Sequence, residues 1–142
     1  MQTKKVVMLC LILIILSVPV YASDNAELQE ENINVVSSRF SNISVFYNVF
    51  EITESGKAML TSSITSRETD EIKISTYLQK YENRSWVTVK HWTTIQPGTI
   101  AVLGEQWYVA SGYQYRMKSY AYVYKDDVFL ESTVYTSNSK IY

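Results

Sequence analysis

The chain has 142 residues, of which 46% are hydrophobic, and its 13 basic and 14 acidic side chains give a net charge of −1. Nucleic-acid binding needs a clustered basic face, and because the lysines and arginines are scattered along the chain we expect neither a nucleic-acid partner nor any other polyanion partner. The only cysteine is Cys10, so we expect no disulfide, thiolate nucleophile or cysteine metal site in the rest of the chain.

The first 22 residues have the parts of a secretory signal peptide. Lys4 and Lys5 precede an apolar run of 15 residues, Val6–Val20. Ala22 supplies the small residue before a cut. The run is shorter than the roughly 20 residues of a transmembrane helix, so we predict a secreted, extracellular protein without stable membrane insertion. Cleavage would leave 120 residues with a charge of about −3, because two lysines are lost.

The rest of the chain divides into two parts. Residues 23–40 are polar and acidic and contain too few apolar residues to pack, which predicts a flexible acidic leader. In residues 41–142, alternating apolar and polar residues are interrupted every ~10 positions by turn residues, a spacing typical of an all-β sandwich or barrel. We predict one β-sandwich domain there. An exported domain without a cystine also favours a bacterial over an animal source.

The alternation predicts seven strands: Ser44–Ile52, Lys57–Thr65, Ile72–Tyr81, Ser85–Thr93, Thr99–Trp107, Tyr113–Tyr124 and Val128–Thr136. In three of these strands one parity is apolar and should face the core: Ala58, Leu60 and Ile64; Ile72, Ile74 and Leu78; Val128, Leu130 and Val134. In the sixth strand the core parity is Tyr115, Met117, Ala121 and Val123. No helical spacing persists after the leader, so we expect almost no helix.

The turn before the sixth strand carries a more specific signal. Gly112 is followed by a strand whose third residue is Tyr115. This resembles the tyrosine corner of immunoglobulin-like and fibronectin type III-like sandwiches, in which the phenol hydroxyl bonds to the backbone of the preceding corner. The resemblance implies an immunoglobulin-like antiparallel β-sandwich of about seven strands and implies no function.

The six residues Tyr81–Trp86 predict a tight hairpin centred on Asn83 and Arg84. Arg84 would need a positive φ, at a cost of about 1 kcal/mol. Together with the tyrosine-rich strands on either side, YLQKYENRSWVTVKHW and YRMKSYAYVY, this hairpin resembles a group of small secreted proteins of uncharacterised function in Gram-positive bacteria. The resemblance implies a small exported β-domain and brings no activity. Arg84 stands where glycine is expected, which departs from the pattern.

The sequence does not indicate an enzyme or a cofactor. His91 is the only histidine, no G-x-S-x-G or H-E-x-x-H pattern occurs, and strand phase points His91 to the same side as Val87 and Val89. We therefore expect a structural or edge histidine and not a catalytic base. Acidic residues in turns could bind calcium, but their spacing matches no known loop, and such residues are common in turns for their own hydrogen bonds. They are Glu68, Asp70, Glu71, Asp126 and Asp127. We predict no metal site.

The aromatic pattern is the one candidate binding feature. If Glu82 pairs with Ser85, the hairpin register places Tyr81 opposite Trp86, Tyr77 opposite Lys90 and Ser75 opposite Trp92, all on the face away from Leu78. In an immunoglobulin-like topology the third and sixth strands are neighbours, so outward tyrosines of the sixth strand would join this face. The predicted aromatic face consists of Tyr77, Tyr81, Trp86, Trp92, Tyr120, Tyr122 and Tyr124.

Three interpretations of this face stay open. Aromatic surfaces bind sugar rings and anchor protein partners, which predicts a secreted, non-enzymatic binding module for a glycan or a protein surface. Alternatively, the rings stabilise the sheet, with Lys73, Lys90, Arg116 and Lys118 lying over them. In another alternative, the protein is a structural protein whose copies assemble through edge strands. If the face is outward, replacing Trp86 and Trp92 by serine should leave the fold largely intact.

Overall fold

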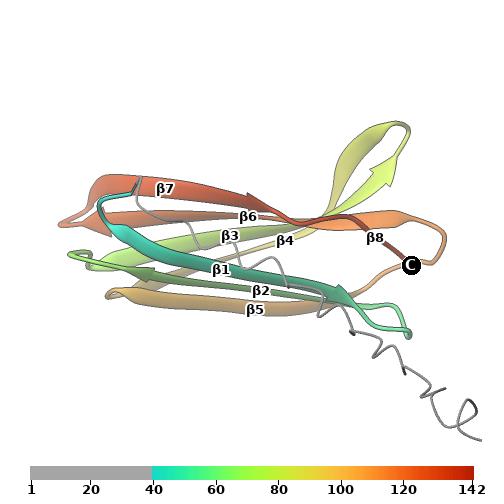
Figure 1. The fold of residues 1–142 in the computed structure, drawn as a ribbon, viewed down its shortest axis with the longest axis horizontal. Helices are drawn as coiled ribbons and strands as arrows, with labels where there is room; N and C mark the ends of the chain where they lie inside the picture. Colours follow the sequence, from blue (N-terminus) through green and yellow to red (C-terminus); the bar gives the residue numbers. More distant parts are fainter. Residues whose placement is uncertain (1–39) are drawn as a thin grey trace, which may run out of the picture. The chain divides into compact units, whose positions relative to one another are not determined.

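The structure is a computed structural model that describes residues 40–142. The predicted signal peptide and the predicted leader up to Arg39 lie outside these residues. Within them the chain forms eight strands and no helix. The strands are β1 (Ile43–Ile52), β2 (Lys57–Ser66), β3 (Glu71–Glu82), β4 (Ser85–Pro97), β5 (Ile100–Tyr108), β6 (Gln114–Lys125), β7 (Val128–Thr136) and β8 (Lys140–Ile141) (Figure 1).

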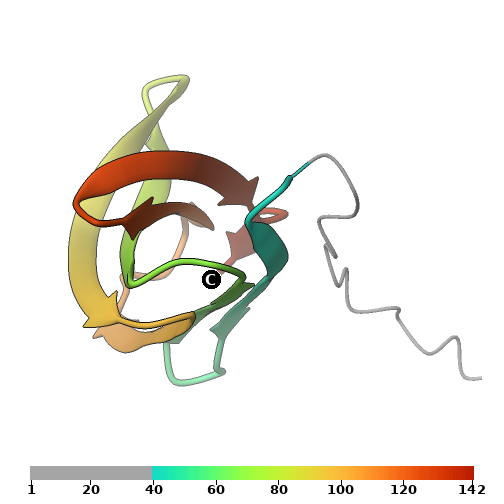
Figure 2. The ribbon, with the colours of Figure 1, turned by 90° about the vertical axis from the view of Figure 1, so that its left-hand side faces the viewer.

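The strands form two packed antiparallel sheets. One sheet has the order β1-β2-β5, and the other has the order β4-β3-β6-β7, with β8 added to β6. Figure 2 looks along the strands and shows the two layers. The predicted all-β antiparallel sandwich is confirmed, and β3 and β6 are neighbours as expected. The strand order differs from that of the seven-strand immunoglobulin constant type, in which the fourth strand belongs to the same sheet as the first. Here β4 pairs with β3 and belongs to the other sheet.

The alternation of side chains generates the core as predicted in β2, β3 and β6. In β2 buried and half-buried positions alternate without exception. A strand turns successive side chains to opposite faces, so one face of each sheet packs on the other. The predicted core residues of these three strands are all buried: Ala58, Leu60, Ile64, Ile72, Ile74, Leu78, Tyr115, Met117, Ala121 and Val123.

The phase predicted for β7 is wrong beyond Leu130. Val128 and Val134 are 60% and 54% exposed. Val128 is the first residue of the strand and pairs with Lys125, before the register changes. For Val134 a β-bulge is the cause: Val123 pairs with Glu131 and Tyr124 with Phe129, so Leu130 is the extra residue. One extra residue reverses the facing of every later side chain, so Tyr135 turns toward the core in place of Val134. Leu130 itself packs against the core, as predicted.

A buried polar layer divides the core in two. Ser62 donates its hydroxyl hydrogen bond to Asn48 Oδ1 over 2.8 Å and lies 2.7 Å from the Ser119 hydroxyl. Thr76 completes the set, 2.8 Å from Ser119. These four residues come from β1, β2, β3 and β6, so the layer links both sheets. Buried hydroxyl and amide groups need such partners, and no buried side-chain nitrogen or oxygen lacks one in the described residues.

Two side chains close the open sides of the sandwich. The side-chain amide of Gln96 on β4 donates to the Val102 carbonyl over 2.8 Å and accepts from its N–H over 3.2 Å, so it binds the free edge of β5. On the opposite side, the Glu131 carboxylate of β7 accepts N–H groups from Ser41, Asn42 and Ile43 at 2.7 to 3.0 Å. Each contact joins an edge strand of one sheet to the other sheet.

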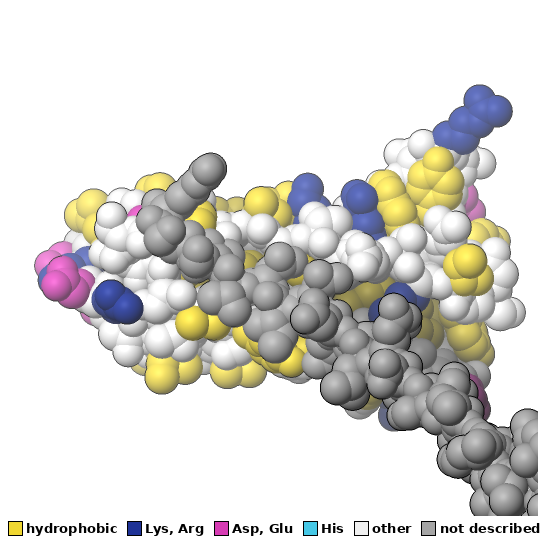
Figure 3. All heavy atoms as spheres, in the orientation of Figure 1, with side chains coloured by type: hydrophobic (Ala, Val, Ile, Leu, Met, Phe, Trp, Pro, Cys, Tyr) yellow, Lys and Arg dark blue, Asp and Glu magenta, His cyan; other side chains and the backbone are white. Residues whose placement is uncertain are grey.

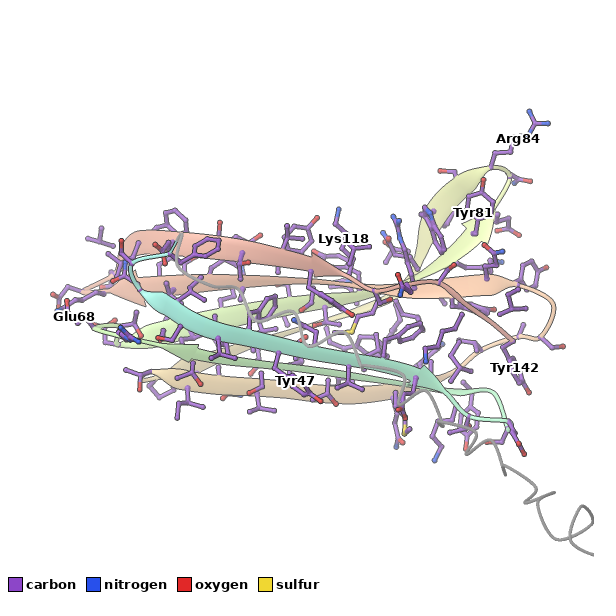
Figure 4. The ribbon with its side chains drawn as sticks, in the orientation of Figure 1. Tyr47, Glu68, Tyr81, Arg84, Lys118 and Tyr142 are labelled. Carbon is purple, nitrogen blue, oxygen red and sulfur yellow. The ribbon has the colours of Figure 1, made fainter. Side chains whose placement is uncertain are left out.

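The predicted turns are confirmed. The Tyr115 side chain is 2% exposed, and its hydroxyl donates to the Ala110 carbonyl over 2.8 Å, which is the contact of a tyrosine corner. Asn83 and Arg84 have φ of 52° and 62°, the two positive values of a type I′ hairpin turn. Figure 4 shows Arg84 at the tip of this hairpin, which stands away from the two sheets.

Tyr115→Phe should lower the free energy of unfolding by roughly 1 kcal/mol or more, because it removes the hydrogen bond that the buried Tyr115 side chain donates to the Ala110 carbonyl. The matched control is Tyr120→Phe, whose hydroxyl makes no hydrogen bond within the described residues. Urea unfolding of both variants measures the difference. Equal losses would show that the corner does not stabilise the fold.

The bond between Glu131 and the start of β1 should make stability depend on acid. Burial raises the pKa of Glu131, but the three N–H groups that bind its charged form outweigh burial and bring the pKa below its usual 4.5. A carboxyl group whose pKa is lower in the folded state stabilises the fold at pH values above its unfolded pKa. This stabilisation disappears as the pH falls through the pKa of the folded state. Glu131→Gln should therefore be less stable than the parent at pH 7, with a gap that closes toward pH 3. A gap that stays constant in urea unfolding across this range would contradict the assignment.

Candidate ligand-binding face

The outer face of the β4-β3-β6-β7 sheet is the side away from the β1-β2-β5 sheet. Strand pairing defines its central rows: Tyr77 lies opposite Lys118 on β6, and Ser75 lies opposite Tyr120. The structure places six of the seven predicted rings on this face: Tyr77, Tyr81, Trp86, Tyr120, Tyr122 and Tyr124. Figure 4 shows Tyr81 and Lys118 extending from this sheet and Tyr47 extending from the other.

Trp92 lies on the opposite face, so its predicted position is wrong. Leu78 pairs with Lys90 but Gln79 pairs with Thr88, which makes Val89 the extra residue of a β-bulge. Beyond the bulge the register moves by one, and Trp92 faces Thr76 and packs against both apolar clusters of the core. The predicted pairings of Tyr77 with Lys90 and of Ser75 with Trp92 fail for the same reason.

The bulge also turns His91 outward, against the predicted inward direction. Its ring lies opposite Tyr77 and stacks on it, with centroids 5.6 Å apart and planes 18° apart. Tyr77 meets Tyr120 edge to face at 5.8 Å, and Tyr120 lies parallel to Tyr122 at 6.4 Å. Together these four rings form a continuous row, here called the ring row, which crosses β4, β3 and β6.

Two further ring pairs lie at the ends of the face. Tyr81 and Trp86 are 5.2 Å apart near the projecting hairpin, and Tyr124 meets Phe129 edge to face at 5.8 Å near the β6–β7 turn. Cross-strand aromatic pairs of this kind contribute about 0.5–1.5 kcal/mol each beyond the area they bury. The rings therefore stabilise the sheet as well as forming its surface.

Cations lie over three of these rings. Lys118 Nζ is 5.3 Å from the centroid of Tyr120, and Lys73 Nζ is 5.9 Å from that of Tyr122. The Arg116 guanidinium is 4.2 Å from Trp86. Lys90, which was expected over the same face, lies 4.6 Å from Trp107 of β5 instead. Three of the four cations expected over the rings of this face therefore lie there.

Acidic groups are sparse on the same face. Glu71, beside Tyr124 at one end, is the only carboxylate among its paired positions in residues 40–142. The one ion pair of the described domain joins Lys80 to Glu82 over 3.1 Å, away from the ring row. In Figure 3 basic side chains rise among apolar ones along the top of the view, whereas acidic side chains gather at its left end. The ring row therefore lies in a locally basic surface.

Burial and crowding keep the Tyr122 phenol protonated. Burial raises the pKa of Tyr122, and the neighbouring phenols of Tyr120, Tyr77 and Tyr124 raise it further, because each phenolate would repel the next. The Tyr122 hydroxyl therefore remains a hydrogen-bond donor over the whole physiological pH range.

Other candidate chemistry finds no geometric support. No three metal-ligating side chains gather in the part of the chain that the structure describes, and the acidic turn residues do not converge. Ser137 and Lys140 have the Ser-x-x-Lys spacing of some nucleophilic serines. The Ser137 hydroxyl instead binds the Met117 N–H and the Asn138 carbonyl, both at 2.9 Å, and so holds the end of β7.

Comparison with known proteins adds no family. No family model, no curated protein and no solved structure matches this chain. The resemblance to small secreted proteins of Gram-positive bacteria thus stays a prediction. No helix among the described residues is long and apolar enough to cross a membrane. Function has to be inferred from the residues of the fold.

The opposite facing of the two tryptophans predicts unequal effects of their removal. Trp92→Ser should cost about 3–5 kcal/mol, because it leaves a cavity beside both core clusters. Trp86→Ser should cost roughly 1–2 kcal/mol, from the lost contacts with Arg116 and Tyr81. Urea unfolding of the two single variants measures both values. The predicted inequality replaces the expectation that the fold tolerates both substitutions. Equal costs would mean that the bulge at Val89 is absent.

Proposed function

We propose that the protein is a secreted, non-enzymatic binding module that holds a glycan or a protein surface on the outer face of the β4-β3-β6-β7 sheet. The observation that carries the proposal is the ring row of His91, Tyr77, Tyr120 and Tyr122 on a sheet face that no other described element covers. Tyrosine combines a large apolar contact area with a polar hydroxyl and little conformational freedom, which suits it to recognition at a surface.

The two outer faces of the sandwich differ in their aromatic content. At the centre of the β1-β2-β5 sheet the outward residues of β2 are Thr61, Ser63 and Thr65. Tyr47 and the terminal Tyr108 are the rings that this sheet turns outward in the described domain. A sheet that needed rings only for strand stability would not require them on one side alone. The asymmetry supports a role for the ring row in recognition.

The edge strands argue against the alternative of assembly through strand pairing. β4 and β7 each carry a bulge, at Val89 and Leu130, and β1 is irregular between Ile43 and Val45. Gln96 occupies the edge of β5 at Val102. Bulges and covered edges are the features by which β-proteins prevent edge-to-edge pairing. These features favour a binding module over an assembling structural protein.

The non-enzymatic part of the proposal is supported by His91. Its ring stacks on Tyr77, and no carboxylate or hydroxyl within the described residues hydrogen-bonds to it. A general base of the usual kind is oriented by such a partner and lies near a nucleophile. His91 therefore fits a role as one ring of the row.

A glycan array with matched tyrosine variants tests the proposal. Tyr77→Ala removes the centre of the ring row, whereas Tyr47→Ala removes a half-buried tyrosine from the outer face of the other sheet. The parent and Tyr47→Ala should bind the same glycans, and Tyr77→Ala should lose them at least tenfold. A parent that binds no glycan or protein partner and elutes as a concentration-dependent oligomer would favour assembly instead. Equal losses in the two variants would place the binding surface elsewhere.

A further inference from the structure

The cations beside the ring row have defined positions and no acidic partner. Lys118 and Lys73 each lie over a tyrosine ring of the row, and Arg116 lies over Trp86 while its Nε donates to Gln79 Oε1 over 2.9 Å. A ring contact limits the conformations of a long side chain but leaves its N–H donors available. These three charges are therefore positioned and not neutralised within the described domain.

The cations form a line along the seam of β3 and β6. Arg116 and Lys118 are two residues apart on β6, and Lys73 lies opposite Tyr122, four residues beyond Lys118. At a rise of 3.3 Å per residue the line is about 20 Å long. A small anion needs converging donors, whereas a line of separated charges matches a chain that carries repeated anionic groups.

The rings in this line offer edges and hydroxyls more than open faces. His91 stacks on Tyr77, and Tyr120 lies parallel to Tyr122, with Lys118 over the Tyr120 ring. Nucleic-acid bases bind single-strand platforms by stacking on open aromatic faces. The phenol hydroxyls of these rings instead match the hydroxyl groups of sugars.

We propose that the ligand of this face is an anionic polysaccharide. Its sugar hydroxyls bond to the tyrosine hydroxyls of the ring row, and its carboxylate or sulfate groups pair with Lys73, Lys118 and Arg116. The inference rests on the proposed function, because it specifies the ligand class of the same face. It also revises the expectation that no polyanion binds, because folding gathers three cations on one surface.

Affinity electrophoresis of the full chain in gels containing a single polymer tests the inference. The polymers are polygalacturonate for carboxylated sugars, dextran sulfate for sulfated sugars, dextran for neutral sugars, polyglutamate for a polyanion without sugars, and oligothymidylate for nucleic acid. We expect retardation by polygalacturonate, dextran sulfate or both, and at least tenfold weaker retardation by the other three. The polymer that retards identifies the anionic group.

The matched variants have the same change of charge. Lys73→Gln with Lys118→Gln should reduce retardation at least tenfold, whereas Lys57→Gln with Lys140→Gln, two lysines outside this face, should leave it unchanged. Equal losses would show that net charge alone determines binding and would overturn the inference.

The failures of the two proposals are distinguishable. Equal retardation by dextran overturns the anionic class and leaves the binding module standing. Equal retardation by polyglutamate or oligothymidylate overturns the sugar class. No retardation by either anionic polysaccharide overturns the inference, and if the glycan array is also empty the glycan-binding function fails with it.

Discussion

A layer of four polar side chains at the centre of the sandwich constrains the register of both sheets. Asn48, Ser62, Thr76 and Ser119 are buried, and each finds a partner in another strand. A slip of one residue in any of these strands would place an apolar group opposite an unsatisfied hydroxyl, which costs about 1–3 kcal/mol for each buried group. The layer thus fixes the strand register of residues 40–142, which contain no disulfide. The apolar clusters on either side of the layer provide most of the stability.

The two bulges follow from the need to enclose this layer. Trp86 and Trp92 are six residues apart, so in a regular strand both would face the same side. The extra residue at Val89 lets Trp86 stay outward with Tyr81 while Trp92 packs against both core clusters. The bulge at Leu130 does the same for Tyr135 on β7. Trp92 and Tyr135 therefore lie beside the polar layer, on opposite sides of it. The same bulges interrupt the regular hydrogen-bonding pattern of the two edge strands.

The sequence predicts the strands, most of the core and the tyrosine corner, because alternation and turn residues are local signals. It does not predict the bulges, because an extra residue such as Val89 is itself a typical strand residue and leaves no turn signal in the sequence. Serine and threonine at core positions resemble outward residues, which hides Ser62 and Ser119. The contacts of Gln96 and Glu131 join distant segments and have no local pattern. Six rings of the aromatic face are placed correctly, and Trp92 fails because it follows a bulge.

The proposed ligand binds one surface, the ring row with its flanking lysines, and nuclear magnetic resonance can observe that surface directly. Titration of the labelled protein with a short oligomer of the anionic polysaccharide that retards it should shift the ring resonances of Tyr77, Tyr120 and Tyr122 together with the side-chain signals of Lys73 and Lys118. The resonances of Tyr47, on the other sheet, should not move. Shifts centred on Tyr47, or saturation without any change at Tyr77 and Tyr120, would contradict the account.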